Sequence, residues 1–105
     1  MRILSTDEER MKGYQFTNSP PSPGEGLLFV FNNEESHQFH MNNVGFDLDL
    51  LGFDRNGCLV CNIPMKSGVR ILYKTPPVKF VVEAPSGWSN SLMPGESLLR
   101  IRRIV

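Results

Sequence analysis

The stretch Leu27-Leu28-Phe29-Val30-Phe31 indicates the fold class of this chain of 105 residues. A continuous run of apolar residues bounded by turn signals is typical of a buried β-strand. Before it lies a segment rich in Pro and Gly, residues 17–26, whose three prolines remove backbone donors. We interpret this segment as a crossing loop, so the sequence around the run favours a mostly β protein.

Further short strands are predicted on both sides of this run. We expect them at residues 2–4, 38–42, 46–53, 58–63, 78–83 and 98–105. Residues 32–35 are expected to form the turn that brings 38–42 back against the apolar run. Asp54-Arg55-Asn56-Gly57 is a strong hairpin signal, because Asn and Gly tolerate the left-handed conformation that closes such a loop.

One short helix is predicted near the N-terminus. Ser5 and Thr6 are each followed three residues later by a glutamate, which is the capping-box spacing. Gly13 is a suitable terminator, so we expect a helix over residues 6–12. With the strands, this predicts a mainly β fold, either a small β-sandwich or a barrel-like domain with one short N-terminal helix. The length favours a single domain over residues 1–105.

The charges of the chain cancel, with eleven Lys and Arg against eleven Asp and Glu. A neutral chain has no general attraction to phosphate backbones or anionic membranes, so we expect neither a nucleic-acid nor a membrane partner. The only basic cluster, Arg100, Arg102 and Arg103, is interpreted as a solvated strand edge. No segment has the character of a signal peptide or a membrane span, so we expect a soluble, cytoplasmic protein.

Short motifs in a fixed order cover the chain from about residue 6 to residue 101. They are Arg10-Met11-Lys12-Gly13-Tyr14, Gly26-Leu27-Leu28-Phe29-Val30-Phe31, Phe39-His40-Met41-Asn42-Asn43-Val44, Asp47-Leu48-Asp49, Asp54-Arg55-Asn56-Gly57, Tyr73, Pro77-Val78-Lys79-Phe80-Val81-Val82-Glu83 and Pro94-Gly95-Glu96. No single motif is specific, but in this order they resemble the DUF192 family of uncharacterised small β-rich domains. The resemblance implies the fold and leaves ligand and activity open.

The departures from the family pattern are concentrated in one segment. His40 stands where the family usually has Trp, Asn42 where it has Lys, Val44 where it has Thr, and Asp47 where it has Pro. If this segment lines a functional surface, the ligand preference differs from that of relatives. Family members often carry an export or anchor signal, which the first residues here do not resemble.

The leading functional hypothesis is a non-enzymatic module that binds a small ligand, with a carbohydrate as one candidate. Its predicted site is a groove lined by polar and aromatic residues: Phe39, His40, Met41, Asn42, Asn43, Asp49, Tyr73, Glu83 and Trp88. Trp88 lies beside hydroxyl and amide side chains, as in surfaces on which sugars stack. The alternative interpretation of Trp88 is that it caps the open end of a β-sandwich.

Two other functions remain open, and no catalytic residue is assigned. The first is a small acid/base enzyme in which Asp49 and Glu83 divide the roles, with His40 as a proton carrier. This requires the two carboxyl groups to meet in a cleft, whereas each could instead accept hydrogen bonds from a neighbouring turn. The second is an accessory domain whose exposed apolar surface recruits a protein partner. Enzymatic activity is uncertain, and the sequence leans against it.

No cofactor and no metal are predicted. His37 and His40 with Cys58 and Cys61 match the spacing of a zinc site, but both pairs fall in expected strands. Residues three apart in a strand point to opposite faces, which prevents each pair from converging. The cysteines are interpreted as reduced and structural, and no phosphate-binding loop is present.

Overall fold

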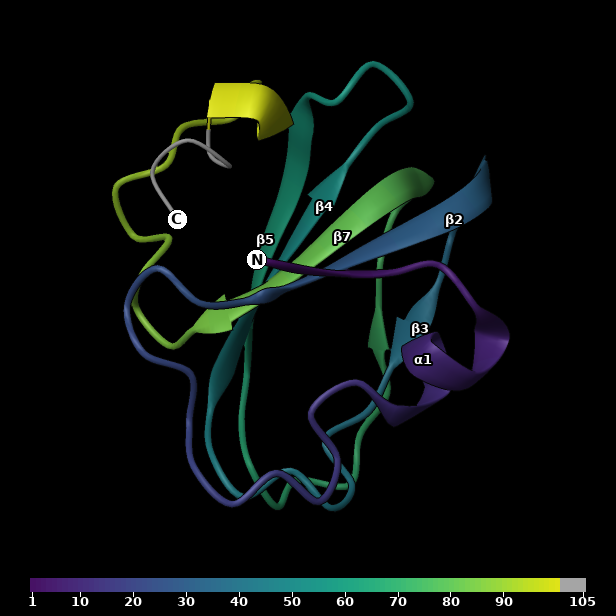
Figure 1. The fold of residues 1–105 in the computed structure, drawn as a ribbon. Coiled ribbons are helices and arrows are strands. Elements are labelled where there is room, and N and C mark those ends of the chain that lie inside the picture. Colours follow the sequence, from purple (N-terminus) through teal and green to yellow (C-terminus); the bar gives the residue numbers. More distant parts are fainter. Residues whose placement is uncertain (101–105) are drawn as a thin grey trace.

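The computed structural model describes residues 1–100, which form a curved sheet flanked by one helix and several loops (Figure 1). The elements are β1 (Arg2–Leu4), α1 (Asp7–Lys12), β2 (Leu27–Glu35), β3 (Gln38–Phe39), β4 (Leu48–Phe53), β5 (Leu59–Met65), β6 (Tyr73–Lys74) and β7 (Val78–Pro85). Five strands make a sheet in the order β1-β2-β7-β4-β5, and β3 pairs with β6 in a second, two-stranded sheet. The prediction of a mainly β fold with one short N-terminal helix is confirmed.

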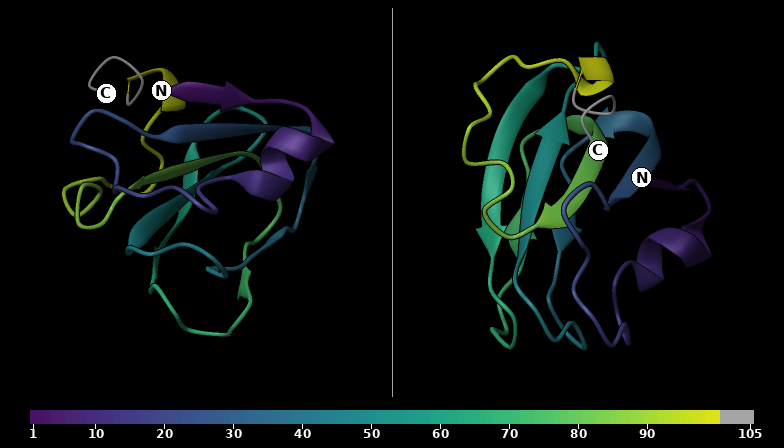
Figure 2. Two further views of the ribbon diagram at one scale, coloured as in Figure 1. Left: turned by 60° about the horizontal axis from the view of Figure 1, so that its bottom comes forward. Right: turned by 60° about the vertical axis from the view of Figure 1, so that its left-hand side comes forward.

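The central strands are apolar on both faces because both faces of the large sheet are covered. Along β2, Leu27 and Phe29 face one core while Leu28 faces the other, which explains the continuous apolar run. All six residues of β4 are buried for the same reason. Two views of the ribbon place α1 and the C-terminal segment on opposite sides of the sheet (Figure 2).

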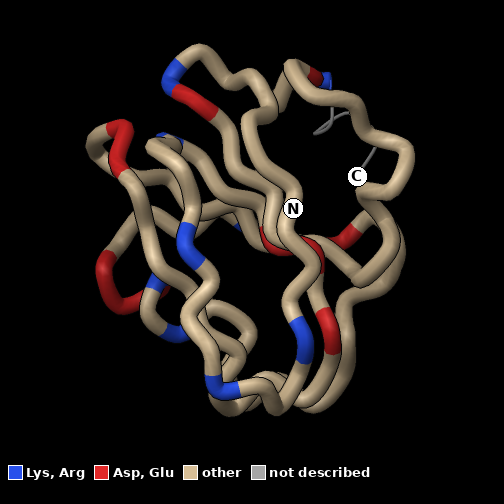
Figure 3. The backbone as a smooth tube through the Cα atoms, turned by 180° about the vertical axis from the view of Figure 1, so that it is seen from behind, with Lys and Arg blue, Asp and Glu red and all other residues tan. Residues whose placement is uncertain are grey.

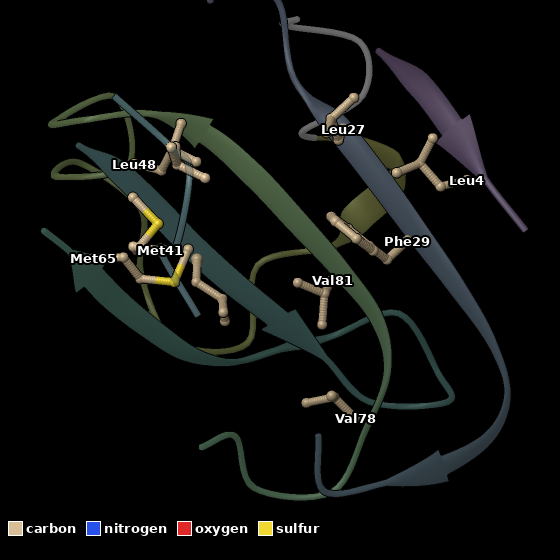
Figure 4. Packing of buried hydrophobic residues seen from close by; sticks show 10 residues of the cluster. Leu4, Leu27, Phe29, Met41, Leu48, Met65, Val78 and Val81 are labelled. Atoms are coloured by element: carbon tan, nitrogen blue, oxygen red, sulfur yellow. The ribbon is translucent and has the colours of Figure 1, made fainter. Parts of the chain in front are cut away.

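The core on the side of α1, here called the helix-side core, is the larger of the two. It consists of Leu4, Leu27, Phe29, Met41, Val44, Leu48, Leu50, Met65, Val78 and Val81. Met41 comes from the loop after β3 and Met65 from the end of β5, and both extend into the space beside Leu48 (Figure 4). Two flexible thioether side chains fill the irregular gap where loops meet the sheet.

The core on the other side, here called the C-terminal core, is covered by the segment that follows β7. It consists of Leu28, Leu51, Phe53, Leu59, Val82, Ala84 and Leu98. Trp88 and Leu92 are partly buried and pack against it. Trp88 therefore packs against an apolar face of the sheet, whereas the alternative interpretation placed it at the open end of a β-sandwich.

Helix α1 is fixed at both ends as its sequence predicts. The Oγ1 of Thr6 accepts a hydrogen bond from the Glu9 N–H at 3.1 Å, and Oε1 of Glu9 accepts one from the Thr6 N–H at 3.1 Å. This reciprocal pair is the expected capping box. At the other end Gly13 adopts φ +48° and ψ −127°, a conformation that a residue with a side chain rarely takes.

The hairpin between β4 and β5 also forms where it is predicted. Oδ1 of Asp54 accepts hydrogen bonds from the N–H groups of Asn56 at 2.9 Å and Cys58 at 3.0 Å. Gly57 closes the loop with φ +80°. The short polar side chain and the glycine together account for this turn.

Three expectations about strands are wrong. Residues 32–35 are not a turn but continue β2, since Glu35 pairs with Val78 of β7. Strand β3 is only two residues long and pairs with β6 rather than with β2. Residues 98–100 are helical, and the remainder of the last expected strand, 101–105, lies outside the described residues. In the first two cases partners distant in the sequence override the local signal.

Charged residues of both signs are interspersed along the backbone (Figure 3). Of the predicted basic cluster, Arg102 and Arg103 lie outside the described residues, and Arg100 lies 3.8 Å from the Glu96 carboxylate. Among residues 1–100, no helix has the length and apolar character needed to cross a membrane.

Candidate ligand-binding site

A hollow of about 560 Å³ lies between α1, β2 and β3. We call it the α1 hollow. Its lining comes from five separate parts of the chain: Asp7, Arg10, Met11, Lys12, Gly13, Tyr14, Gln15, Phe29, Phe31, His37, Gln38, Phe39, His40, Val44 and Glu83. Aromatic rings and one buried carboxyl group dominate this list, and it includes three of the predicted site residues, Phe39, His40 and Glu83.

The carboxyl group of Glu83 is the buried polar group of the hollow. Glu83 is only 5% exposed, and its side chain makes no hydrogen bond with any of residues 1–100. Burial alone raises its pKa to about 8, so the group is mostly protonated and neutral at pH 7. A carboxyl group in this state is an uncommon feature of a protein interior, where buried polar groups are normally paired.

Gly13 leaves the space that this carboxyl group occupies. A β-carbon added at Gly13 would lie 3.4 Å from Oε1 of Glu83 and 3.5 Å from Cζ of Phe29. The residue that ends α1 thus also shapes the floor of the α1 hollow. The glycine of the helix terminator and the strand glutamate, 70 positions apart, are direct neighbours.

Three phenylalanines form the apolar wall of the hollow. The rings of Phe29 and Phe39 meet edge to face with centroids 5.5 Å apart, and Phe31 and Phe39 do so at 6.5 Å. His37 stacks on Phe31 at 3.7 Å, and its Nε2 is buried without a hydrogen-bond partner among the described residues. Burial lowers the pKa of His37 more than the nearby Glu35 raises it, so this imidazole is neutral at pH 7.

Arg10 of α1 and Tyr14, which follows the helix, also line the hollow. The guanidinium of Arg10 donates to the carbonyl oxygens of Ser5 at 2.6 Å and Val30 at 2.9 Å, and to Asp7 at 2.7 Å. The bond to Val30 links α1 to β2 and so fixes the position of the helix beside the hollow. Burial, together with the charge of Glu83, raises the pKa of the half-buried Tyr14 to about 12, so its hydroxyl remains protonated.

Asp49 lies on the opposite face of the sheet from Glu83. Leu50 is the cross-strand partner of Glu83 and Ala84 is the partner of Asp49, so the two carboxyl groups project to different sides. Oδ2 of Asp49 accepts from the Gly87 N–H at 3.0 Å, the Ser89 N–H at 3.3 Å and the Ser89 hydroxyl at 2.6 Å. The hypothesis of an Asp49–Glu83 acid/base pair is therefore wrong, and Asp49 instead organises the turn after β7.

The other predicted site residues are divided among different places. His40, Met41, Asn42 and Asn43 line a second, wider hollow of about 920 Å³, the loop hollow, although Met41 is itself a core residue. Tyr73 packs on the helix-side core and accepts a hydrogen bond from the Lys66 N–H at 3.0 Å. His40 lines both hollows.

The loop hollow lies where three loops meet at one end of the molecule. Phe16 is 73% exposed and its N–H donates to the Asn43 carbonyl at 2.9 Å, although a φ of +62° is unfavourable for such a bulky residue. Ile71 and Leu72 are also exposed there. These side chains are the exposed apolar group on which the protein-partner hypothesis depends.

The residues of the α1 hollow coincide with positions of the motifs described above. Arg10 and Gly13 belong to the helix-end motif, Phe31 to the apolar strand, Phe39 to the central segment and Glu83 to the end of β7. Arg10, Gly13, Tyr14 and Phe31 also line the hollow but were not predicted as site residues. Their membership in the motifs was the available signal, but only the fold brings these segments together.

Among residues 1–100, no group of three or more His, Cys, Asp or Glu side chains is arranged to hold a metal ion. Cys58 and Cys61 are both free thiols. Cys61 packs against the helix-side core, and burial raises the pKa of its thiol.

The fold and this site define a class of protein: a small mainly β domain with an aromatic, ligand-sized hollow on one side of a mixed sheet. A family model matches residues 1–98, and the chain belongs to the DUF192 family, described as Uncharacterized ACR. The resemblance inferred from the motifs is thereby confirmed. No curated protein matches the chain.

Two solved structures share this fold. One is a protein of unknown function from Novosphingobium aromaticivorans, with a TM-score of 0.84 and 20% identity, covering 90% of this chain and 70% of that one. The other is a putative transcription regulator from Sinorhizobium meliloti, with a TM-score of 0.83 and 21% identity, covering 90% of this chain and 76% of that one. Identities this low establish a common fold.

Proposed function

We propose that this protein is a non-enzymatic binding module that holds a small organic molecule in the α1 hollow, with a polar group of the ligand against Glu83. One observation carries the proposal: a nearly buried carboxyl group without a partner among residues 1–100 lies in a hollow walled by aromatic rings. The volume of about 560 Å³ falls within the range of about 300–1,000 Å³ typical of ligand sites.

The energetics of Glu83 favour a ligand. Burial raises the pKa of Glu83, because the ionised carboxylate is poorly solvated there. A ligand that donates hydrogen bonds to this group offsets that cost, and its apolar part gains from contact with Phe39. Groups with strongly shifted pKa values are common at functional sites, so the position of Glu83 in the hollow supports a binding role.

Two earlier hypotheses lose support from the geometry. A carbohydrate stacked on Trp88 is disfavoured, because Trp88 packs against the C-terminal core and does not line the α1 hollow. An acid/base enzyme built on Asp49 and Glu83 is disfavoured, because the two groups lie on opposite faces of the sheet. The α1 hollow supports binding without either of them.

The test is a ligand screen that compares the natural protein with two matched variants. Glu83→Gln removes the buried carboxyl group of the hollow, and Glu34→Gln changes an exposed glutamate on β2 outside it. A ligand at 100 times its Kd stabilises the folded protein by about 2.7 kcal/mol, which raises Tm by several degrees. We expect such a shift in the natural protein and Glu34→Gln, and a much smaller one in Glu83→Gln.

NMR amide shifts locate the site independently. Ligand binding should move the signals of Gly13, Phe31 and Phe39. Ligands whose shifts cluster instead at Phe16 and Ile71 would place the binding site in the loop hollow and contradict the proposal.

A further inference from the structure

We infer that the ligand of the α1 hollow carries an organic cation, a protonated amine, that lies against the Glu83 carboxylate and the aromatic rings. The inference rests on the proposed function and specifies its ligand class.

The hollow offers a carboxyl group that receives no hydrogen bond from the described residues. Glu83 lines the hollow and has no hydrogen-bond donor among residues 1–100. An ionised carboxylate only accepts hydrogen bonds, whereas a protonated amine carries up to three donors and no acceptor, so the two groups complement each other.

The hollow also has an aromatic wall. A cation over the face of an aromatic ring gains about 0.5–2 kcal/mol, with the larger value in a desolvated site. Phe31 already has the Arg10 guanidinium 5.4 Å from its ring centroid and His37 stacked on it. The rings that remain for a ligand are therefore Phe39 and Tyr14, which line the same hollow.

The charged groups around the hollow do not oppose a cation at Glu83. The titratable residues that line the hollow besides Glu83 are Asp7, Arg10, Lys12, Tyr14, His37 and His40. Arg2 and Glu25 lie outside the lining, but their charges contribute to the pKa of Tyr14. Arg10 is already paired with Asp7 and two carbonyl oxygens. Burial is the sole cause of the raised pKa of Glu83, so no resident cation neutralises this carboxyl group.

An anionic ligand fits the floor of the hollow less well. Two carboxyl groups in contact at neutral pH must share a proton, since like charges at short distance destabilise each other. A neutral ligand could accept a hydrogen bond from protonated Glu83, but it would gain nothing from the electrostatic attraction of an aromatic face for a cation.

This ligand class makes binding depend on pH in a defined direction. Glu83 binds a proton below about pH 8, and a cation requires the ionised form, so binding displaces that proton. The affinity for a cation should therefore rise about tenfold per pH unit up to about pH 8 and then level off. A neutral ligand that accepts from protonated Glu83 would show the opposite trend.

Three probes that share a ring and differ in charge test the inference: benzylamine, benzyl alcohol and benzoate. Calorimetric titrations between pH 6 and 8 would be made with the natural protein, Glu83→Gln and Glu34→Gln, after thermal unfolding has shown that each variant is folded. We expect benzylamine to bind most tightly, with affinity rising with pH. Glu83→Gln should weaken it at least tenfold at pH 8, and Glu34→Gln, at an exposed residue that does not line the hollow, should leave it unchanged.

The other outcomes separate the inference from the proposed function. Tighter binding of benzyl alcohol or benzoate that is lost in Glu83→Gln would overturn the cation and retain the binding site. Benzylamine binding that Glu83→Gln does not weaken would overturn the cation against Glu83. Failure of all three probes at millimolar concentration would count against both proposals.

Discussion

Two buried carboxyl groups on adjacent strands of the same sheet have opposite surroundings. Asp49 of β4 is 4% exposed and Glu83 of β7 is 5% exposed. Asp49 receives three hydrogen bonds from Gly87 and Ser89, whereas Glu83 receives none from residues 1–100. Equal burial therefore does not imply an equal role.

The difference arises from what each side of the sheet places over its carboxyl group. On the C-terminal side, the turn after β7 aims two N–H groups and a hydroxyl at Asp49, so the group holds that turn in place. On the helix side, α1 ends at Gly13 beside Glu83, and this carboxyl group receives no hydrogen bond from residues 1–100. The first carboxyl group serves the architecture of the fold, and the second is left for a ligand.

The largest predicted effect is the pH dependence that Glu83 imposes on stability. Burial raises the pKa of Glu83 in the folded state, so its contribution is most favourable at low pH and declines as pH rises toward about 8. Because each pKa unit corresponds to about 1.4 kcal/mol, the natural protein should lose roughly 4 kcal/mol relative to Glu83→Gln between pH 5 and pH 8.

Urea denaturation of both proteins across this range measures that difference directly. Glu35→Gln should follow the natural protein at every pH, since Glu35 is exposed. Parallel pH profiles for the natural protein and Glu83→Gln would show that Glu83 titrates normally and would remove the contrast with Asp49.

The second effect is the loss of the Asp49 network. Asp49→Ala leaves the N–H groups of Gly87 and Ser89 without their acceptor, while the Ser89 hydroxyl can still donate to Oδ1 of Asn62 at 3.0 Å. The two unpaired N–H groups should lower the free energy of unfolding by about 3 kcal/mol. Denaturant unfolding measures the loss, and Glu35→Ala should change it by less than about 0.5 kcal/mol. A loss below about 1 kcal/mol would mean that the turn after β7 does not depend on Asp49.

The third effect concerns the space that Gly13 leaves for Glu83. Gly13→Ala introduces a β-carbon 3.4 Å from the Glu83 carboxyl group and forces a non-glycine residue to φ +48°, so we expect a loss of about 2 kcal/mol. Gly24→Ala is the matched control, because Gly24 also has a positive φ, of +90°, but its added β-carbon would meet no atom within 4 Å.

The added β-carbon at Gly13 would make ordinary van der Waals contacts with Glu83 and Phe29, so backbone strain is the main cause of the expected loss. Losses of similar size in the two variants would agree with this. A much larger loss at Gly13 would show that the surrounding side chains cannot accommodate the added methyl group.

The smallest effect lies at the loop hollow, away from both carboxyl groups. Phe16 is exposed at φ +62°, where asparagine is tolerated far better, so Phe16→Asn should raise the free energy of unfolding by about 0.5–1 kcal/mol. Phe16→Ala keeps the strained backbone and should bring no gain in Tm. A decrease for Phe16→Asn would show that the aromatic ring makes a stabilising contact.

Local sequence was sufficient for the elements whose signals act over a few residues. The capping box at Thr6, the terminator Gly13 and the hairpin at Asp54 depend on neighbours within four positions, and each is found as predicted. The polar residues 32–35 resemble a turn, but the pairing of Glu35 with Val78 keeps them in β2. A contact more than 40 positions away cannot be read from a local pattern.

The candidate site was only partly predictable for the same reason. Phe39, His40 and Glu83 were identified, and the structure brings all three to the α1 hollow. The opposite orientation of Asp49 depends on the register between β4 and β7, which sets the face of every residue in both strands. No signal within either strand specifies that register.

The central claim is that Glu83 is a buried, unpaired carboxyl group kept available for a ligand. The most direct measurement is the 13C chemical shift of the Glu83 side-chain carboxyl group as a function of pH, assigned by its loss in Glu83→Gln. We expect a titration midpoint of about 8. A midpoint near the ordinary value of 4.5 would contradict the account, because it would mean that water or a protein group already satisfies this carboxylate.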